Sequence, residues 1–385
     1  NGYTKKNFAE NSSDLFSCFI VRVQALLFHL GRAGLMTPNV WLYIIGQKAL
    51  RENLLRKNSV TNLIELPLTG FSDATVQICA FNVIAGIHSG PAPLFIRLVD
   101  VLGGHKAMPT AAKESIHNSN DNKRFFPKLD SFLSIPDYVF AYWVRPEITE
   151  LFKMERSVED LAPVRQGFQT GDNDQFMRLW FEVSQKTINR DAASIEEFHL
   201  SKAKYAPYLK GGAYRKWFGN NEYVVKFDAS NYDLLLNLGN KLPSRRSYFK
   251  PGVTWSSVSS GDFGARKVSK GSTFSSGGAC AIEESPLEGS FVLALLNSKL
   301  GEQLLSFMAA TLNANVGSIR QLPVPDEINI SNLRNLQLLV ERACSIQEHE
   351  WNLNETSPCF DVGLMLPTAR LNVQVETLSQ QKIEE

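Results

Sequence analysis

The first 90 residues alternate between helical and extended hydrophobic patterns, and this alternation limits the fold more than any other feature. Apolar residues recur at helical spacing over 15–27 and 47–56, whereas strand-like runs occupy 35–36, 60–66 and 75–85. Helices that alternate with strands favour an α/β fold with a doubly wound sheet. No glycine-rich strand-to-helix turn for a nucleotide or adenosyl cofactor precedes them. The pattern therefore predicts the later half of such a sheet.

Charge is distributed unevenly along the 385 residues. The whole chain has 40 basic and 39 acidic residues, yet residues 201–275 hold thirteen basic and four acidic ones, a net charge of +9. The same segment contains thirteen aromatic residues, which a merely solvated face does not need. This asymmetry indicates a module that faces a polyanion, attached to a larger body.

Residues 241–278 concentrate this character. Seven basic residues alternate there with five aromatic ones, and glycines and serines separate them: KLPSRRSYFKPGVTWSSVSSGDFGARKVSKGSTFSSGG. Such a segment can neutralise phosphates and stack on bases. An ordinary β-hairpin with a solvated basic face has the same composition. Residues 252–257 and 261–266 are expected to be its two strands, around a serine-rich turn.

The composition excludes several classes of protein. No run of about 18 apolar residues is present, so no membrane span is expected. The five cysteines and six histidines are dispersed, which predicts neither a metal site nor a disulfide framework and fits a reducing cytoplasm. The chain opens on Asn1 without a visible signal peptide, which suggests a fragment of a longer cytoplasmic protein.

Ordered motifs along the chain resemble one enzyme family. The segments that carry the resemblance are DLFSCFIVRVQALL, GRAGLMTPNVWLY, QKALRENLL, ATVQICAFNVI, SIPDYVFAYWV, GFQTGDNDQFMRLWFEV, KGGAYRKWFGNNEYVVKF, GVTWSSVSSGDFGARKVSKG, LALLNSKL, LNANVGSIRQLPVP and EWNLNETS. In this order they resemble the C-terminal portion of the PglX family, the adenine-specific DNA methyltransferases of BREX phage-defence systems. Restriction–modification methyltransferases of the type IIG kind are more distantly similar.

The resemblance implies adenine-N6 methylation of DNA with S-adenosyl-L-methionine as the methyl donor, on a base flipped out of the duplex. The family's glycine cofactor motif and its Asn-Pro-Pro-Tyr tetrad are absent from these residues. We therefore predict no catalytic, cofactor-binding or metal-binding residue in this chain, which by itself is expected to be inactive. The implied partners are double-stranded DNA and other phage-defence proteins, with no membrane.

The resemblance also implies four parts. Residues 1–90 are expected to be the truncated C-terminal half of a Rossmann-like methyltransferase sheet, followed by a connector at 91–160. An α+β DNA target-recognition domain is expected at 161–325, and a helical spacer and tail at 326–385. Helices are expected at 291–307 and, in the spacer, along an apolar stripe of Leu333, Leu336, Val340, Ala343 and Ile346.

The predicted DNA contacts are polar or basic residues of three blocks. The first is a loop between two glycines, which permit close backbone approach to a phosphate, although a capped tight turn explains the same sequence. In the second, basic residues beside Trp217 suit phosphates or a solvated face, and Trp217 itself suits the core. In the third, long arginines could read guanine edges, whereas Trp255 suits the core. The predicted set is Gln169, Thr170, Gly171, Asp172, Asn173, Arg215, Lys216, Arg245, Arg246, Tyr248, Ser256, Ser259, Arg266, Lys267 and Asn315.

Three alternative functions remain open from the sequence. A single-chain restriction–modification methyltransferase differs only by a nuclease motif elsewhere. A non-enzymatic specificity or DNA-binding protein needs no methyltransferase sheet, so the pattern at 1–90 weighs against it. A degenerate gene product would have no activity.

Overall fold

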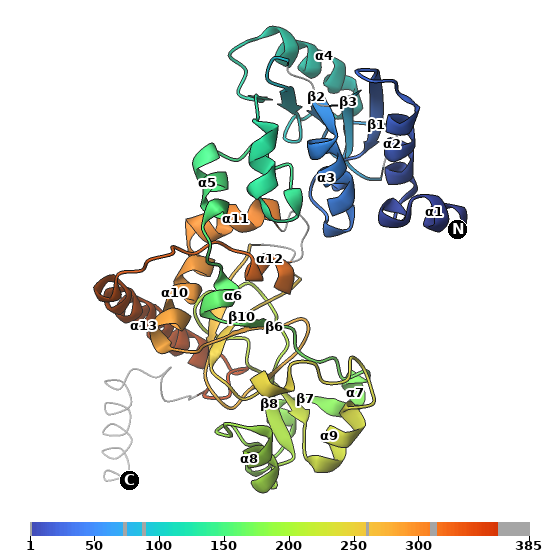
Figure 1. Ribbon diagram of the computed structural model, residues 1–385. Coiled ribbons are helices and arrows are strands. Elements are labelled where there is room, and N and C mark those ends of the chain that lie inside the picture. The colour runs from blue at the N-terminus through green and yellow to red at the C-terminus, as the bar shows by residue number, and fades with distance from the viewer. Residues whose placement is uncertain (1, 72–74, 87–89, 259–261, 309–313, 361–385) are drawn as a thin grey trace, which may run out of the picture. The chain divides into compact units, whose positions relative to one another are not determined.

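The computed structural model describes residues 2–71, 75–86, 90–258, 262–308 and 314–360. The chain divides into two compact units, and the boundary falls between Glu155 and Arg156. The first unit is Asn1–Glu155 with Leu304–Thr311, and the second is Arg156–Gln303 with Leu312–Glu385. Figure 1 shows the elements of each unit.

The first unit contains a five-stranded sheet with helices around it. Its helices are α1 (Gly2–Asn7), α2 (Leu15–Leu26), α3 (Lys48–Arg56), α4 (Gly104–His117) and α5 (Pro146–Glu150). Its strands are β1 (Arg32–Pro38), β2 (Asn58–Glu65), β3 (Ile78–Ala85), β4 (Leu94–Arg97) and β5 (Arg124–Phe125). The αβαββ order predicted for the first 90 residues is confirmed, and the segment predicted as a connector supplies two further strands.

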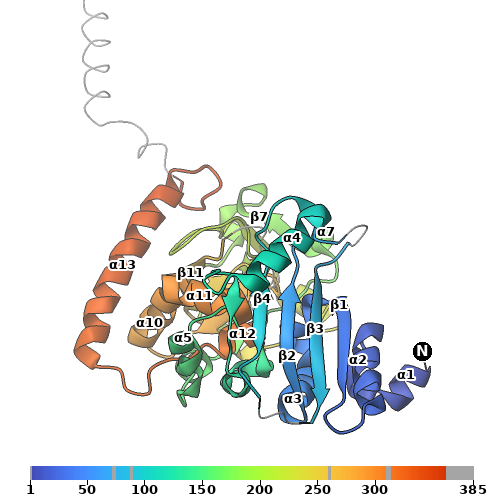
Figure 2. The same cartoon turned by 90° about the horizontal axis from the view of Figure 1, so that it is seen from above.

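The sheet has the order β1-β3-β2-β4-β5, and β1, β3 and β2 lie side by side in Figure 2. β3 pairs antiparallel with β1 and β2, whereas β4 runs parallel to β2. Side chains alternate between the two faces: Ile96 packs toward Met108 of α4, and the neighbouring Phe95 stacks with Phe140. Both faces of the sheet are therefore covered, as an α/β fold requires.

The second unit combines short strands with helices at its margins. Its helices are α6 (Val158–Leu161), α7 (Asn173–Phe176), α8 (Ile195–Leu200), α9 (Ala229–Leu235), α10 (Pro286–Asn297), α12 (Val316–Arg320) and α13 (Ile330–Asn352), and the unit boundary falls within α11 (Lys299–Met308). Its strands are β6 (Val164–Arg165), β7 (Met177–Leu179), β8 (Tyr205–Leu209), β9 (Tyr223–Lys226), β10 (Gly252–Trp255), β11 (Ala265–Val268), β12 (Thr273–Phe274) and β13 (Cys280–Ile282).

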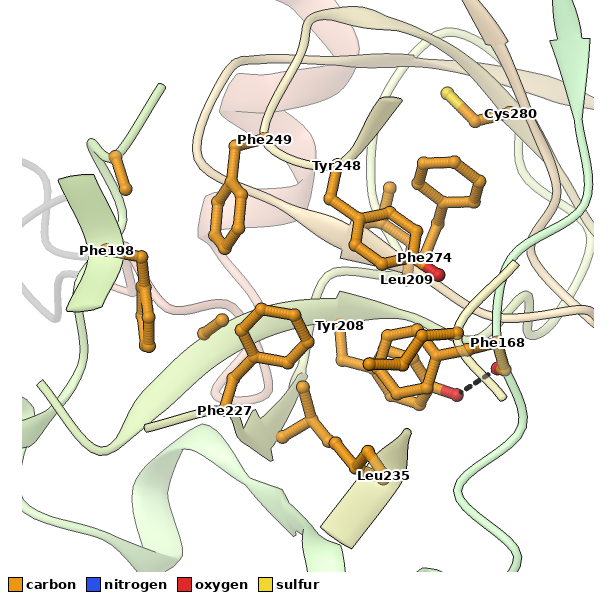
Figure 3. Packing of buried hydrophobic residues seen from close by; sticks show 14 of the residues in the cluster. Phe168, Phe198, Tyr208, Leu209, Phe227, Leu235, Tyr248, Phe249, Phe274 and Cys280 are labelled. Atoms are coloured by element: carbon orange, nitrogen blue, oxygen red, sulfur yellow. Dashed lines mark hydrogen bonds between the residues drawn. The ribbon is translucent and has the colours of Figure 1, made fainter. Parts of the chain in front are cut away.

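These strands form two four-stranded sheets, ordered β11-β10-β13-β6 and β12-β8-β9-β7. β10 and β11 pair antiparallel, which confirms the hairpin predicted within 241–278. The two sheets share an aromatic core that includes Phe168, Phe227, Phe249 and Phe274, and Figure 3 shows these rings packed together.

The helical predictions at 291–307 and 330–352 need two corrections. Residues 291–307 form the parts of two helices, α10 and α11, rather than one, because Ser298 adopts an extended conformation and accepts a hydrogen bond from the Gly301 amide at 3.0 Å. In α13 the buried residues include Leu333, Val340 and Cys344, whereas Ile346 is exposed. The buried stripe therefore turns toward Cys344 and Trp351.

Candidate nucleic-acid interface

The loop 167–173 is held in place by a buried phenylalanine. Phe168 is fully buried against Tyr208 and Tyr248, at ring distances of 4.8 and 5.5 Å. The Tyr208 hydroxyl donates to the Phe168 carbonyl at 2.7 Å, and the dashed line in Figure 3 marks this bond. The Phe168 amide donates to the Phe274 carbonyl at 3.1 Å. Phe168 is therefore the apolar anchor of this loop.

A neighbouring turn holds the loop from a second direction. The Gln169 amide donates to Oδ1 of Asn240 at 2.6 Å, and Nδ2 of the same asparagine donates to the Gly167 carbonyl at 3.0 Å. Gly239 packs so closely on the loop that a Cβ there would lie 1.9 Å from the Gln169 carbonyl oxygen. One asparagine and one glycine therefore fix the loop backbone.

The two glycines of the loop serve different needs. Gly171 has a φ of +79°, the left-handed conformation that glycine adopts at no steric cost. Gly167 is needed for close approach, because a Cβ at that position would lie 1.9 Å from the Phe274 carbonyl oxygen. The turn is present, and the close approach at Gly167 is to the protein's own backbone, whereas approach to a phosphate stays a prediction.

The polar side chains of the loop organise one another. Thr170 Oγ1 donates to Asn173 Oδ1 at 2.8 Å, and Asp172 accepts from the Gln175 amide at 3.0 Å as the N-cap of α7. Gln169 Nε2 donates to the Ser276 hydroxyl at 3.1 Å. The capping role that the sequence allowed for Asp172 is thus present, and contact of these residues with DNA stays a prediction.

A cavity of about 380 Å³, the loop pocket, lies against this loop. Its described lining comes from residues 168–171 and Asn173, from Tyr208 and Lys210, and from the glycine-serine segment 275–277. Lys210 Nζ donates to Asn173 Oδ1 at 3.0 Å. Three segments far apart in the sequence therefore meet around one lysine.

The site prediction missed Lys210. The lysine follows strand β8 directly and precedes Gly211, whose φ is +92°. The sequence signal for Lys210 was its place between a strand of apolar residues and a glycine. A glycine at such a point allows a sharp turn, so that other backbone segments can approach the lysine closely. Ser256, which was predicted, lies near this segment and donates from its hydroxyl to the Gly212 carbonyl at 2.9 Å.

Four of the five aromatic residues of 241–278 are buried, which corrects their predicted stacking role. Tyr248, Phe249 and Phe274 are buried in the aromatic core, and Trp255 is fully buried as expected. Burial raises the pKa of the Tyr248 hydroxyl well above its ordinary value. Tyr248 therefore supports the loop from beneath and is removed from the predicted DNA contacts.

Arg266 is also removed from these contacts, because its side chain is only 1% exposed. The backbone of Trp217 pairs with β11 on both sides of Arg266, donating to the Ala265 carbonyl and accepting from the Lys267 amide at 2.8 Å each. Desolvation lowers the pKa of Arg266 to about 10, although the charge of Glu222 opposes this shift. A guanidinium buried in this way cannot read a base edge.

Three further predicted residues make contacts within the protein. The Arg215 guanidinium lies 4.6 Å from the ring centre of Trp351 in α13, and Lys216 Nζ donates to the Asn297 carbonyl at 2.9 Å. Asn315 is the N-cap of α12 and accepts from the Ser318 amide at 3.0 Å. These contacts anchor the side chains to helices, and their contact with DNA stays a prediction.

The remaining predicted basic residues, Arg245, Arg246 and Lys267, are exposed. Arg245 and Arg246 lie in a short 3-10 helix, and Lys267 points outward from β11, next to the buried Arg266. Ser259 lies outside the described residues. The exposed cations of this segment are therefore separated from its aromatic residues, which form the core.

The described residues show neither a metal site nor a membrane span. They contain no group of three or more histidine, cysteine, aspartate or glutamate side chains placed to hold a metal ion. No helix among them has the length and apolarity needed to cross a membrane.

Comparison with known proteins identifies what the chain is similar to. Residues 1–71 match the family model of the Eco57I restriction-modification methylase. The adenine-specific methyltransferase BrxX of Escherichia coli O9:H4 (strain HS) is 32% identical over 362 residues, and the match covers 92% of this chain and 28% of that protein. The adenine-specific methyltransferase PglX of Lacticaseibacillus casei (strain Zhang) is 29% identical over 375 residues, 94% of this chain and 30% of that protein.

The resemblance to adenine-specific methyltransferases is confirmed. The chain spans less than a third of the length of these two curated relatives. Among solved structures, the Type IIL restriction-modification enzyme MmeI in complex with DNA matches 91% of this chain and 46% of its own, with a TM-score of 0.48 and 11% identity. That similarity score is too low to support an argument about this chain.

Proposed function

We propose that this chain recognises duplex DNA within a site-specific adenine-N6 DNA methyltransferase of a phage-defence system of the BREX type. The observation that carries the proposal is the match to BrxX and PglX along more than nine tenths of the chain. In this proposal the first unit is the C-terminal part of a Rossmann-like methyltransferase sheet. Residues 161–325 are the target-recognition domain, and α13 is the spacer helix.

The second unit supplies the physical support for recognition. Its residues 201–275 carry a net charge of +9, and most of the phosphate affinity of DNA-binding proteins comes from such charge. The loop 167–173 adds polar side chains on a backbone fixed by Phe168, Asn240 and Gly239. A rigid polar loop in the same unit as exposed cations suits a duplex, whose phosphates position the protein while base edges specify the site.

The methyl donor that the resemblance implies does not fit the described residues. In the first unit, the connection from β1 to α3 contains Gly46 and the one from β4 to α4 contains Gly103 and Gly104, so neither has the three glycines of an adenosyl-binding turn. We therefore derive no methyl-transfer step from this chain. The proposed contribution of these residues is the choice of the DNA site.

Salt dependence of binding tests the proposal. We expect the chain to bind a fluorescent duplex of about 30 base pairs, with log K falling linearly against log salt concentration at a slope of several units. Fluorescence anisotropy at a series of salt concentrations measures this slope. A chain that is folded by circular dichroism but does not bind, or binds independently of salt, would contradict DNA recognition.

A further inference from the structure

We propose that the loop pocket binds one phosphate of the DNA backbone and that Lys210 neutralises its charge. This inference rests on the DNA-recognition function proposed above and assigns a specific contact to it. The observation that points to it is a half-buried lysine facing a polar cavity in which it has no acidic partner among the described residues.

The charge of Lys210 is not balanced by a protein carboxylate. Its described hydrogen bond goes to the neutral Oδ1 of Asn173, and none of the ion pairs between described residues includes it. Because an ammonium group has three protons, two are left to donate to a ligand oxygen. Partial burial lowers the pKa of Lys210, a cost that a bound anion offsets.

The lining of the loop pocket suits an oxyanion. None of its described lining residues is acidic, and Thr170, Ser275 and Ser276 bring hydroxyl groups to it. Asp172 belongs to the loop but not to this lining, and its carboxylate accepts from the Gln175 amide. At about 380 Å³, the cavity is in the size range of ligand sites and has room for a phosphate with part of its sugar.

The pocket is held rigid by buried side chains and by hydrogen bonds within its walls. Phe168 is buried beneath it, and Asn240 fixes the backbone on either side of Phe168. On the opposite wall, Ser275 Oγ accepts from the amides of Gly277 and Gly278 at 3.1 and 3.0 Å. A preformed site loses little conformational entropy on binding, so one phosphate contact there contributes more than a contact to a mobile surface lysine.

The source of the phosphate is inferred from the surroundings of the pocket. Lys210 lies within the segment 201–275 of net charge +9, and exposed Arg245 and Arg246 belong to the same segment. A single free phosphate does not require so many cations, whereas a polymer of phosphates does. The site is therefore assigned to a phosphodiester of the duplex.

The first experiment compares Lys210→Gln, Lys210→Arg and the control Lys186→Gln by anisotropy with the same duplex at several salt concentrations. Lys186 is exposed in the second unit and lies outside the basic segment. We expect Lys210→Gln to reduce the salt slope by about one unit, while Lys210→Arg and Lys186→Gln keep the wild-type slope. An unchanged slope for a folded Lys210→Gln protein overturns the inference while leaving DNA recognition intact. Absence of wild-type binding overturns DNA recognition itself.

The second experiment alters the DNA and compares the wild-type protein with Lys210→Gln. Duplexes with one neutral methylphosphonate at successive positions remove one phosphate charge each. We expect one position to weaken binding of the wild-type protein but not of Lys210→Gln, because the lysine and that phosphate form one contact. Equal losses in both proteins at every position contradict the contact. A third outcome is that Lys210→Gln abolishes specific binding of inorganic phosphate but does not change the salt slope of DNA binding. This outcome would assign the pocket to a free anion and overturn the DNA contact.

Discussion

The loop 167–173 and the hairpin β10–β11 were both predicted to contact DNA, but they differ in which of their side chains are buried. In the loop, the apolar residue Phe168 is buried and the polar residues line a cavity. In the hairpin, the long cation Arg266 is buried, and its neighbour Lys267 is exposed. Composition therefore does not determine which side chains of a segment face outward, because that direction depends on what packs against the segment.

The edges of the two segments also differ. The backbone of Trp217 pairs with β11 at Arg266, so this edge of the hairpin is occupied by protein. In the described part of the chain, the polar side of the loop opens onto the loop pocket. Residues that remain uncovered are the ones available to a ligand.

The largest expected effect comes from removing the loop's anchor. Phe168→Ala should lower the free energy of unfolding by about 3–5 kcal/mol, because it leaves a cavity in the aromatic core. Urea unfolding followed by tryptophan fluorescence measures the change. The control is Phe181→Ala, since Phe181 is 52% exposed and its loss should cost less than about 1 kcal/mol. Equal effects of the two substitutions would mean that the loop is not anchored by its phenylalanine.

The next largest effect comes from Gly239, which packs closely on the backbone of the loop. Gly239→Ala should destabilise the protein by about 1–3 kcal/mol and weaken DNA binding, because the φ of +54° is strained for alanine and the new Cβ meets the Gln169 carbonyl. Thermal unfolding and anisotropy report the two changes. Gly46→Ala is the matched control, since a Cβ there has no atom within 4 Å. A variant that is destabilised but binds DNA normally would show that the close packing of Gly239 on the loop is not needed for DNA binding.

Adjacent residues of one strand test the orientation of the hairpin. Lys267→Gln should reduce the salt slope of DNA binding by about one unit if the exposed face of β11 meets a phosphate, whereas Arg266→Met should leave the slope unchanged. Anisotropy titrations of both variants give the comparison. A reduced slope for Arg266→Met alone would reverse the orientation described above.

The smallest expected effect concerns Glu222, which lies near the buried Arg266. Desolvation by burial raises the pKa of the Glu222 carboxyl, although the charge of Arg266 opposes this shift. Below pH 4.5 the carboxyl is protonated in both folded and unfolded chains, and stability is lost as pH rises through the raised pKa. Glu222→Gln should remove part of that loss, measured as unfolding free energies between pH 4 and pH 8. The exposed Glu284→Gln is the control, and identical pH profiles of wild type and Glu222→Gln would contradict the expectation.

Local patterns in the sequence predicted the elements of the first unit well. The helical spacing at 47–56 and the strand-like run at 60–66 correspond to α3 (Lys48–Arg56) and β2 (Asn58–Glu65) within two residues at each end. Gly171 was predicted from the need for a positive φ, which a sequence reveals because only glycine takes it freely. These features depend on neighbours along the chain.

Features that depend on distant residues were not predictable in the same way. The edge of β11 pairs with Trp217, which is distant in the sequence, and the loop pocket requires residues near 170, 210 and 276 to meet. The break between α10 and α11 lies at a serine that caps the second helix. The apolar pattern continues through this point, so it did not reveal the break. Long-range packing, rather than propensity, decides such positions.

Hydrogen exchange with and without duplex DNA tests most directly whether the loop pocket is part of the recognition surface. DNA should slow amide exchange in peptides that contain residues 167–173, 210–212 and 275–277, because these segments line or adjoin the loop pocket. Peptides from the sheet of the first unit serve as the internal reference within the same sample. Protection concentrated in the three segments supports the account, whereas DNA binding that leaves all three unprotected would contradict it.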